Sequence, residues 1–440
     1  MGTVTVDQAR LVLNTFMTIF EDNLVTGEAC SWHEHDGEMD DLNKLQVVEQ
    51  VAPRYAVTRT TNGVKDLTAG TDGSVFGSEI FTINGTFNAN MGWGDFIKVR
   101  DIGSARESKA IAGAATSMAE KIDAYILGIA TLAPNNWTGT IGNNVADYID
   151  AIAPYTRLKE GGVGDNDLRL IMTHMDRQLL GDQVVNLPNE TGDGVYRKGF
   201  KGMIGDMPTL FTNSLPILTV GSRTYGGANV LEMVGASQNV NYADVANSTS
   251  TNGNFKTQTI SIDGSGLGTV NTIKAGEVFT IEGVYAYDNR KQAAVSPARL
   301  QQFTVVEDAV AVAGAITALR IYPAMIVPAS GSGDNININT AHATVTAANA
   351  DNADLTFMGT ASTAYGPRLL IQKEAIEVNT VPLIMPAVGI AMRKKLSRIP
   401  LTVRMWQWSD FNTGAHSVRF DCALNANIRS RDRASKFNGA

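Results

Sequence analysis

The sequence has little cysteine, little charge and no long apolar run, and each shortage excludes a class of protein. Two cysteines in 440 residues, Cys30 and Cys422, exclude a disulfide framework and lack the spacing of a zinc site. The longest apolar stretch, residues 383–392, is interrupted by Pro386 and falls well short of the roughly 18 residues of a membrane span. The N-terminus has neither the basic start nor the apolar core of a signal peptide, so we expect a cytosolic origin.

Composition narrows the class further. Hydrophobic residues make up 44% of the chain and charged residues 18%, which excludes a disordered chain. The net charge of −8 argues against tight nucleic-acid binding by the whole chain. This charge is unevenly spread. The first 50 residues carry ten acidic and two basic side chains, whereas residues 393–440 carry ten basic and three acidic ones. Opposite charges predict attraction between copies of the chain, and the alternative is two solvated tails.

The length predicts two to four structural units, and hydrophobic spacing outlines them. Apolar residues recur at helical spacing over 6–23 and 104–133. The second segment starts with the capping-box residues Ser104 and Glu107 and predicts a rod of roughly 42 Å. Residues 46–90 are punctuated by glycine and weakly apolar, with a strand expected at 79–84. We expect this stretch to be an extended arm that needs a partner.

The second half of the chain changes character twice. Residues 135–218 mix helical and strand patterns, which is typical of α+β proteins. Residues 236–360 are rich in Asn, Thr, Ser and Gly and predict a small β-barrel or sandwich inserted between α+β segments. Its strands are expected at 257–262, 278–287, 300–306, 318–326 and 343–347. Further strands are expected at 369–378, 401–408 and 418–428, the last half-buried, before a basic flexible tail at 429–440.

A search for catalytic and ligand-binding motifs finds no enzyme signature. Cys30, His33 and His35 form the one cluster with metal-ligand residue types, but their acidic loop-like surroundings favour a solvated arm. His174 follows a predicted strand without a nucleophile elbow, so we interpret it as a packing residue. The glycines of 264–268 are better explained by a turn than by a dinucleotide loop. We therefore expect no enzyme activity, cofactor or metal, and a protein whose surfaces carry its function.

The order of these elements resembles the major capsid (coat) protein of tailed bacteriophages, in the branch with an inserted β-domain, as in short-tailed Salmonella phages. The most specific sequence segments of this resemblance are LPIL at 215–218, KAGEVFTIEGVY at 274–285 and LQQFTV at 300–305. The resemblance implies an α+β capsid fold with a long spine helix, an extended loop, axial and peripheral domains, and a small inserted β-barrel.

The resemblance also implies a division of the chain. The expected regions are an N-terminal arm (1–45), the extended loop with flanking strands (46–100), the spine helix of the peripheral domain (101–134), the axial domain (135–222), the inserted β-domain (223–360), the axial return (361–400), and peripheral strands with a basic C-terminal tail (401–440). Contacts between subunits are expected at Arg54, Lys65, Phe76, Arg429, Arg431 and Arg433.

The implied function is a structural protein that self-assembles into pentamers and hexamers of an icosahedral shell around double-stranded DNA. The implied partners are further copies of the chain, a scaffolding protein and a portal, with no tight sequence-specific DNA binding and no membrane. The expected location is the virion, after assembly in the host cytoplasm. Two alternatives remain open: a cellular nanocompartment shell of the same fold, and a carbohydrate- or ligand-binding protein that uses the β-domain. Some relatives crosslink subunits, which here would join Lys65 to Asn425 or Asn427, although the insertion branch generally lacks this bond.

Overall fold

The computed structural model shows an α+β protein built around three six-stranded sheets. It describes residues 6–37, 45–51, 77–92, 109–164, 166–185, 203–204, 207–224, 230–246, 250–251, 255–328, 334–409 and 416–440. The predicted capping box at Ser104 and the predicted contacts Arg54, Lys65 and Phe76 lie outside these residues. Within them, no helix is both long and apolar enough to cross a membrane.

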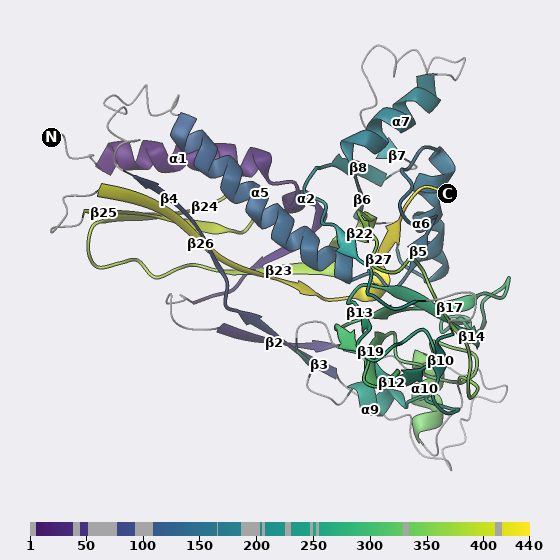
Figure 1. Cartoon of the computed structure of the whole chain (residues 1–440). Coiled ribbons are helices and arrows are strands. Elements are labelled where there is room, and N and C mark those ends of the chain that lie inside the picture. The colour runs from purple at the N-terminus through teal and green to yellow at the C-terminus, as the bar shows by residue number, and fades with distance from the viewer. Residues whose placement is uncertain are drawn as a thin grey trace, which may run out of the picture.

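The first sheet carries the longest elements. Its strand order is β1 (Ser31–Glu34), β23 (Ile376–Val381), β26 (His416–Ile428), β25 (Thr402–Ser409) and β24 (Ile390–Lys395), with β4 (Thr86–Gly92) also paired to β26. Helices α1 (Val6–Asn23) and α5 (Lys109–Leu132) lie together across one face of this sheet, and the short α2 (Thr26–Ala29) follows α1 (Figure 1). The helices predicted at 6–23 and within 104–133 are confirmed for the described residues.

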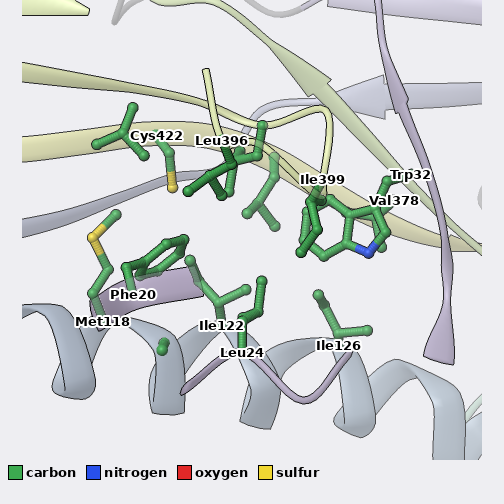
Figure 2. Packing of buried hydrophobic residues seen from close by; sticks show 14 of the residues in the cluster. Phe20, Leu24, Trp32, Met118, Ile122, Ile126, Val378, Leu396, Ile399 and Cys422 are labelled. Atoms are coloured by element: carbon green, nitrogen blue, oxygen red, sulfur yellow. The ribbon is translucent and has the colours of Figure 1, made fainter. Parts of the chain in front are cut away.

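The main core lies between these helices and the sheet. Along α5, Met118, Ile122 and Ile126 project toward the strands and are buried (Figure 2). The Phe16 ring of α1 stacks on Phe420 of β26 with 3.9 Å between ring centroids. Because α1 supplies this much of the core, the described part of the predicted N-terminal arm packs on the first sheet of its own subunit.

A hairpin covers part of the opposite face of the first sheet. Strands β2 (Leu45–Val51) and β3 (Gly77–Ile83) pair in antiparallel register, which confirms the predicted extended segments, and β11 (Ser250–Thr251) adds to β3. Ile83 packs there with Leu383 and Ala423. Strand β26 is therefore covered on both faces and is buried without a break from Phe420 to Ile428, so the prediction of a half-buried strand is wrong.

The second sheet draws all its strands from residues 232–357 and has its own core. Its order is β10 (Glu232–Met233), β12 (Gln258–Asp263), β19 (Ala315–Tyr322), β17 (Leu300–Val305), β14 (Val278–Tyr285) and β20 (Leu355–Phe357). Smaller elements surround it: α9 (Tyr242–Ala246), β13 (Thr272–Ile273) with β18 (Ala309–Val310), β15 (Tyr287–Asp288) with β16 (Ala293–Ala294), and α10 (Asp334–His342). The prediction of a strand at 343–347 is wrong, because this segment has only an isolated bridge, which joins Val345 to Ala286.

The third sheet includes the C-terminal residues. Its order is β5 (Trp137–Thr138), β27 (Ala434–Phe437), β22 (Arg368–Gln372), β6 (Leu168–Met172), β8 (Met207–Phe211) and β7 (Met203–Ile204), accompanied by α6 (Tyr148–Glu160) and α7 (His174–Val185). Strands β9 (Leu218–Thr219) and β21 (Ala364–Tyr365) pair, which brings together the two ends of the segment that forms the second sheet. The prediction of a flexible tail at 429–440 is wrong, since β27 pairs on both edges and is buried.

The segment predicted as one strand at 369–378 is in fact two strands in two sheets. Strand β22 joins the third sheet, the short helix η1 (Lys373–Ala375) turns the chain, and β23 joins the first sheet. The Ala375 carbonyl accepts hydrogen bonds from the backbone N–H groups of Arg429 and Ser430, which fixes this turn. Residues 361–400 therefore contribute to both sheets rather than to a single region.

Candidate functional site at the junction of the sheets

The junction is the segment 429–438, which runs from the end of β26 through the short helix η2 (Arg431–Arg433) into β27. It is the yellow segment near the centre of Figure 1, where the first and third sheets meet the second. Arg429 pairs with Glu49 of the hairpin and, at 3.3 Å, with Glu377 of β23. Arg433 pairs with Glu374. Two of the three arginines predicted to contact other subunits thus have partners in their own chain.

The third arginine, Arg431, is buried at the end of the long helix. Its guanidinium donates to the Leu132 carbonyl at 2.6 Å, so a positive charge caps the C-terminus of α5. The same guanidinium lies 5.7 Å from the ring centroid of Tyr322 on β19. Burial lowers the pKa of Arg431 to about 10. The contact joins α5 to the second sheet through one side chain.

The neighbouring Asp432 makes the same connection by hydrogen bonds. It accepts from the Tyr322 hydroxyl at 2.9 Å and from the Asn135 amide at 3.1 Å. Burial raises the pKa of Tyr322 well above its ordinary value, and the charge of Asp432 adds to this shift, so the phenol stays protonated and donates.

A buried ion pair lies where the chain enters the second sheet. Arg223 Nη2 and Glu277 Oε2 are 2.5 Å apart, and their side chains are only 1% and 2% exposed. The other carboxylate oxygen of Glu277 accepts the N–H groups of Gly221 at 2.8 Å and Lys274 at 2.7 Å. Burial raises the pKa of Glu277 and lowers that of Arg223, while their mutual attraction opposes both shifts. The ion pair and these hydrogen bonds hold the start of β14 against residues 221–223, which lead into the second sheet.

Two further side chains dock the second sheet on the third. The Gln302 amide accepts from the Trp137 N–H at 2.9 Å and donates to the Trp137 carbonyl at 3.1 Å, which imitates a strand pairing with β5. Lys436 of β27 donates to the Gly276 carbonyl at 2.6 Å. A cleft of about 690 Å³ adjoins the other part of the junction, since its lining includes Arg429–Arg433 together with Lys256 and Arg290. Most of the polar groups at the junction therefore serve to hold parts of one subunit together.

The residues singled out for chemistry are not arranged as a reactive centre. The Cys30 thiol is buried, which raises its pKa to about 12. His33 contacts the Ser31 hydroxyl at 3.0 Å and His35 contacts the Asn379 amide oxygen, so the three predicted metal-type residues have separate surroundings. No group of three or more His, Cys, Asp or Glu residues suited to a metal occurs among the described positions. His174 begins α7 and packs against Phe211.

The oppositely charged ends of the sequence meet within one chain. Lys395 on β24 pairs with Glu34 on β1, and Arg398 lies 3.9 Å from Asp22 at the end of α1. The Ser397 hydroxyl donates to Glu21 at 2.7 Å. The β24–β25 turn lies beside α1, and this proximity, rather than a contact between copies, accounts for the pairs that the structure describes.

Comparison with known proteins decides the family. The family model described as P22 coat protein, gene protein 5, matches residues 138–434, which is more than half of the chain and includes the second sheet and the first part of the junction, up to Ala434. The chain belongs to the P22 coat protein family. Membership supports a role as a capsid coat protein and a location in the virion capsid.

Three solved structures are similar to this P22-family chain at low identity. A chain from Mycobacterium phage Che8 has 9% identity, covers 90% of this chain and 86% of its own, and has a TM-score of 0.38. A chain of the capsid of cyanophage P-SCSP1u has 9% identity, covers 94% of this chain and 86% of its own, and has a TM-score of 0.40. A chain of a virus-like particle from Pyrococcus furiosus has 6% identity, covers 97% of this chain and 98% of its own, and has a TM-score of 0.37. The family assignment rests on residues 138–434 alone, and no curated protein sequence matches.

Proposed function

We propose that this protein is the major capsid protein of a phage with double-stranded DNA, and that it self-assembles into pentamers and hexamers of an icosahedral shell. The observation that carries the proposal is the family match over residues 138–434. The net charge of −8 supports weak, sequence-independent contact with packaged DNA. A scaffolding protein, a portal and assembly in the host cytoplasm are part of the proposal, and a catalytic activity is not.

The sheets suggest how the roles are divided within the subunit. We assign the first sheet with α1 and α5 to the peripheral domain and the third sheet to the axial domain. Residues 223–360, which supply every strand of the second sheet, would be the inserted domain. The hairpin β2–β3 would be the base of the extended loop.

The predicted subunit contacts follow from this division. Arg54, Lys65 and Phe76 would contact a neighbouring subunit from the extended loop. Arg429 and Arg433 have side chains that are 40% exposed, so each retains surface to offer a neighbour beside its own carboxylate partner. Arg431 is buried, which favours a role inside the subunit.

Electron microscopy of the full chain after size-exclusion chromatography tests the proposal. Closed or aberrant shells in the void volume are expected, and nucleic acid rather than a protein cargo inside them would separate a virion shell from a nanocompartment. A monomer with a saturable ligand, which also fails to assemble when a scaffolding protein is supplied, would overturn the proposal.

A deletion separates assembly from folding. Replacing residues 52–76 with a short Gly/Ser linker keeps β2 and β3 joined and removes the tip of the proposed loop. We expect loss of shells with an unchanged circular dichroism spectrum. A matched substitution in the exposed β15–β16 turn, such as Lys291→Ser, should leave shells intact.

A further inference from the structure

The most unusual buried group in the described residues is the amine of Lys436. Its side chain is fully buried, and its strand β27 places it in register with Leu369 of β22 and Trp137 of β5. The amine crosses from the third sheet to the second sheet and donates to the carbonyl of Gly276 at 2.6 Å. A lysine, a residue type that is almost never fully buried without a charged partner, thus forms a bridge between two sheets.

Gly276 makes this approach possible. Its φ of +86° favours glycine, and a Cβ atom there would lie 2.9 Å from Leu132 Cδ2. Leu132 and Leu218 line the same spot, so the surroundings of the amine on this side are apolar. The Gly276 N–H is itself held by the Val305 carbonyl at 2.8 Å, which keeps the acceptor in place.

The surroundings suit an uncharged amine better than an ammonium ion. An ammonium has three N–H donors, and within the described residues the Gly276 carbonyl is the only hydrogen-bond acceptor of Nζ. Arg431 lies close enough to repel a positive charge. Glu277 attracts it, but that carboxylate is already engaged with Arg223 and two backbone N–H groups.

Among the described residues, the other elements packed here supply no free carboxylate. The titratable and charged groups around Lys436, its acceptor and Arg431 are Arg431 and Asp432 on η2, Glu79 on β3, Glu277 at β14, Arg223 in the segment entering the second sheet, Tyr365 on β21 and Tyr322 on β19. Asp432 is engaged with Tyr322 and Asn135. The last carbonyls of α5 are bound by Arg431. A proton added to Lys436 would therefore find no new partner.

We propose that Lys436 makes the docking of the second sheet on the third sensitive to pH, because a proton taken up by this amine places a charge in an apolar site beside Arg431 and so favours opening of its contact with the Gly276 turn. The device belongs to the folded subunit and holds whether or not the subunit assembles into a shell. Burial, with repulsion from Arg431, lowers the pKa of Lys436 to about 7, which places the transition in a range that cells experience. The contact between Gln302 and Trp137 carries no titratable group, so it keeps the two sheets together when the Lys436 contact weakens.

The direction of the effect follows from proton linkage. When the contact opens, the amine reaches water and regains an ordinary pKa near 10.4. Between that value and about 7, only the open form binds the proton, so opening becomes easier as the pH falls. Below about 7, both forms are protonated and the effect levels off. The expected change in local opening is about tenfold between pH 8 and pH 6.

Hydrogen–deuterium exchange of the full-length protein from pH 5.5 to 8.5, corrected for intrinsic exchange rates, measures this opening. We expect segments 274–279 and 434–437 to lose about tenfold in protection from pH 8 to pH 6, and Lys436→Met to abolish that pH dependence. Lys291→Met, at a lysine whose side chain is 82% exposed, is the matched control and should behave like the unmodified protein. Equal pH dependence in the Lys436→Met variant and the unmodified protein would overturn the proposal.

A second measurement covers the case in which the Lys436→Met variant does not fold. In the unmodified protein with ¹³C-labelled lysine, one lysine Cε resonance should titrate with a midpoint near 7. If every lysine resonance titrates above pH 9, the amine is an ordinary one and the proposal fails.

Discussion

The buried pair of Arg223 and Glu277 gives the sharpest test of how the second sheet is held. Glu277→Gln removes the charge but preserves the size, and the new amide oxygen can still accept the N–H groups of Gly221 and Lys274. Arg223, whose side chain is 1% exposed, is then left charged without its partner. Removing one member of a buried pair typically costs about 3–5 kcal/mol, and we expect a loss of unfolding free energy in that range.

Urea unfolding followed by circular dichroism and tryptophan fluorescence measures the loss, with the second sheet expected to unfold first. Adding Arg223→Met to the Glu277→Gln variant removes the unpaired buried charge of Arg223 and should recover most of the unfolding free energy. Asp308→Asn is the matched control, because its pair with Lys274 is 54% and 43% exposed and should contribute less than about 1 kcal/mol. A loss below about 1 kcal/mol for Glu277→Gln would show that the pair is not desolvated and would refute the reasoning.

Three further perturbations test the rest of the fold. Asp123→Ala removes a buried carboxylate that accepts the Thr26 N–H at 2.9 Å, and it should lower the unfolding free energy by about 2–4 kcal/mol; an unchanged melting temperature would contradict this. Arg429→Glu places like charges beside Glu49, so limited proteolysis should cut the β2–β3 hairpin faster, and an unchanged digestion rate at low salt would disprove the attachment. Deleting residues 434–440 removes a strand paired on both edges and should give insoluble protein, whereas soluble protein with a native spectrum would refute the central position of β27.

Long, regular segments were predictable because their pattern is repeated many times. The apolar stripe of α5 and the helical spacing of α1 each place several residues on one face, and both helices are present. Strand β26 was equally predictable from its alternating apolar residues. Its burial on both faces was not predictable, because the second face is covered by the β2–β3 hairpin, whose Ile83 lies far from β26 in the sequence.

The junction could not be predicted, because its charged residues have the pattern of a solvent-exposed tail. Arg431 becomes a buried cap only through a carbonyl on Leu132, which lies 299 residues away. Glu277 and Lys436 each lie in a short apolar context, and a charged residue in such a context is the one signal that could have indicated burial. The partners that stabilise them, such as Arg223 and Gly276, could not be identified without the structure.

The late position of β27 in the chain has a consequence for synthesis. Ser435 meets Asn136 across 299 residues, so a nascent chain that has already produced α5 and β5 must wait for almost all later residues before the third sheet can close. Until that moment α5 lacks its Arg431 cap and the second sheet lacks its Lys436 contact. A nascent chain that has not yet produced β27 therefore cannot present a finished subunit to a growing shell.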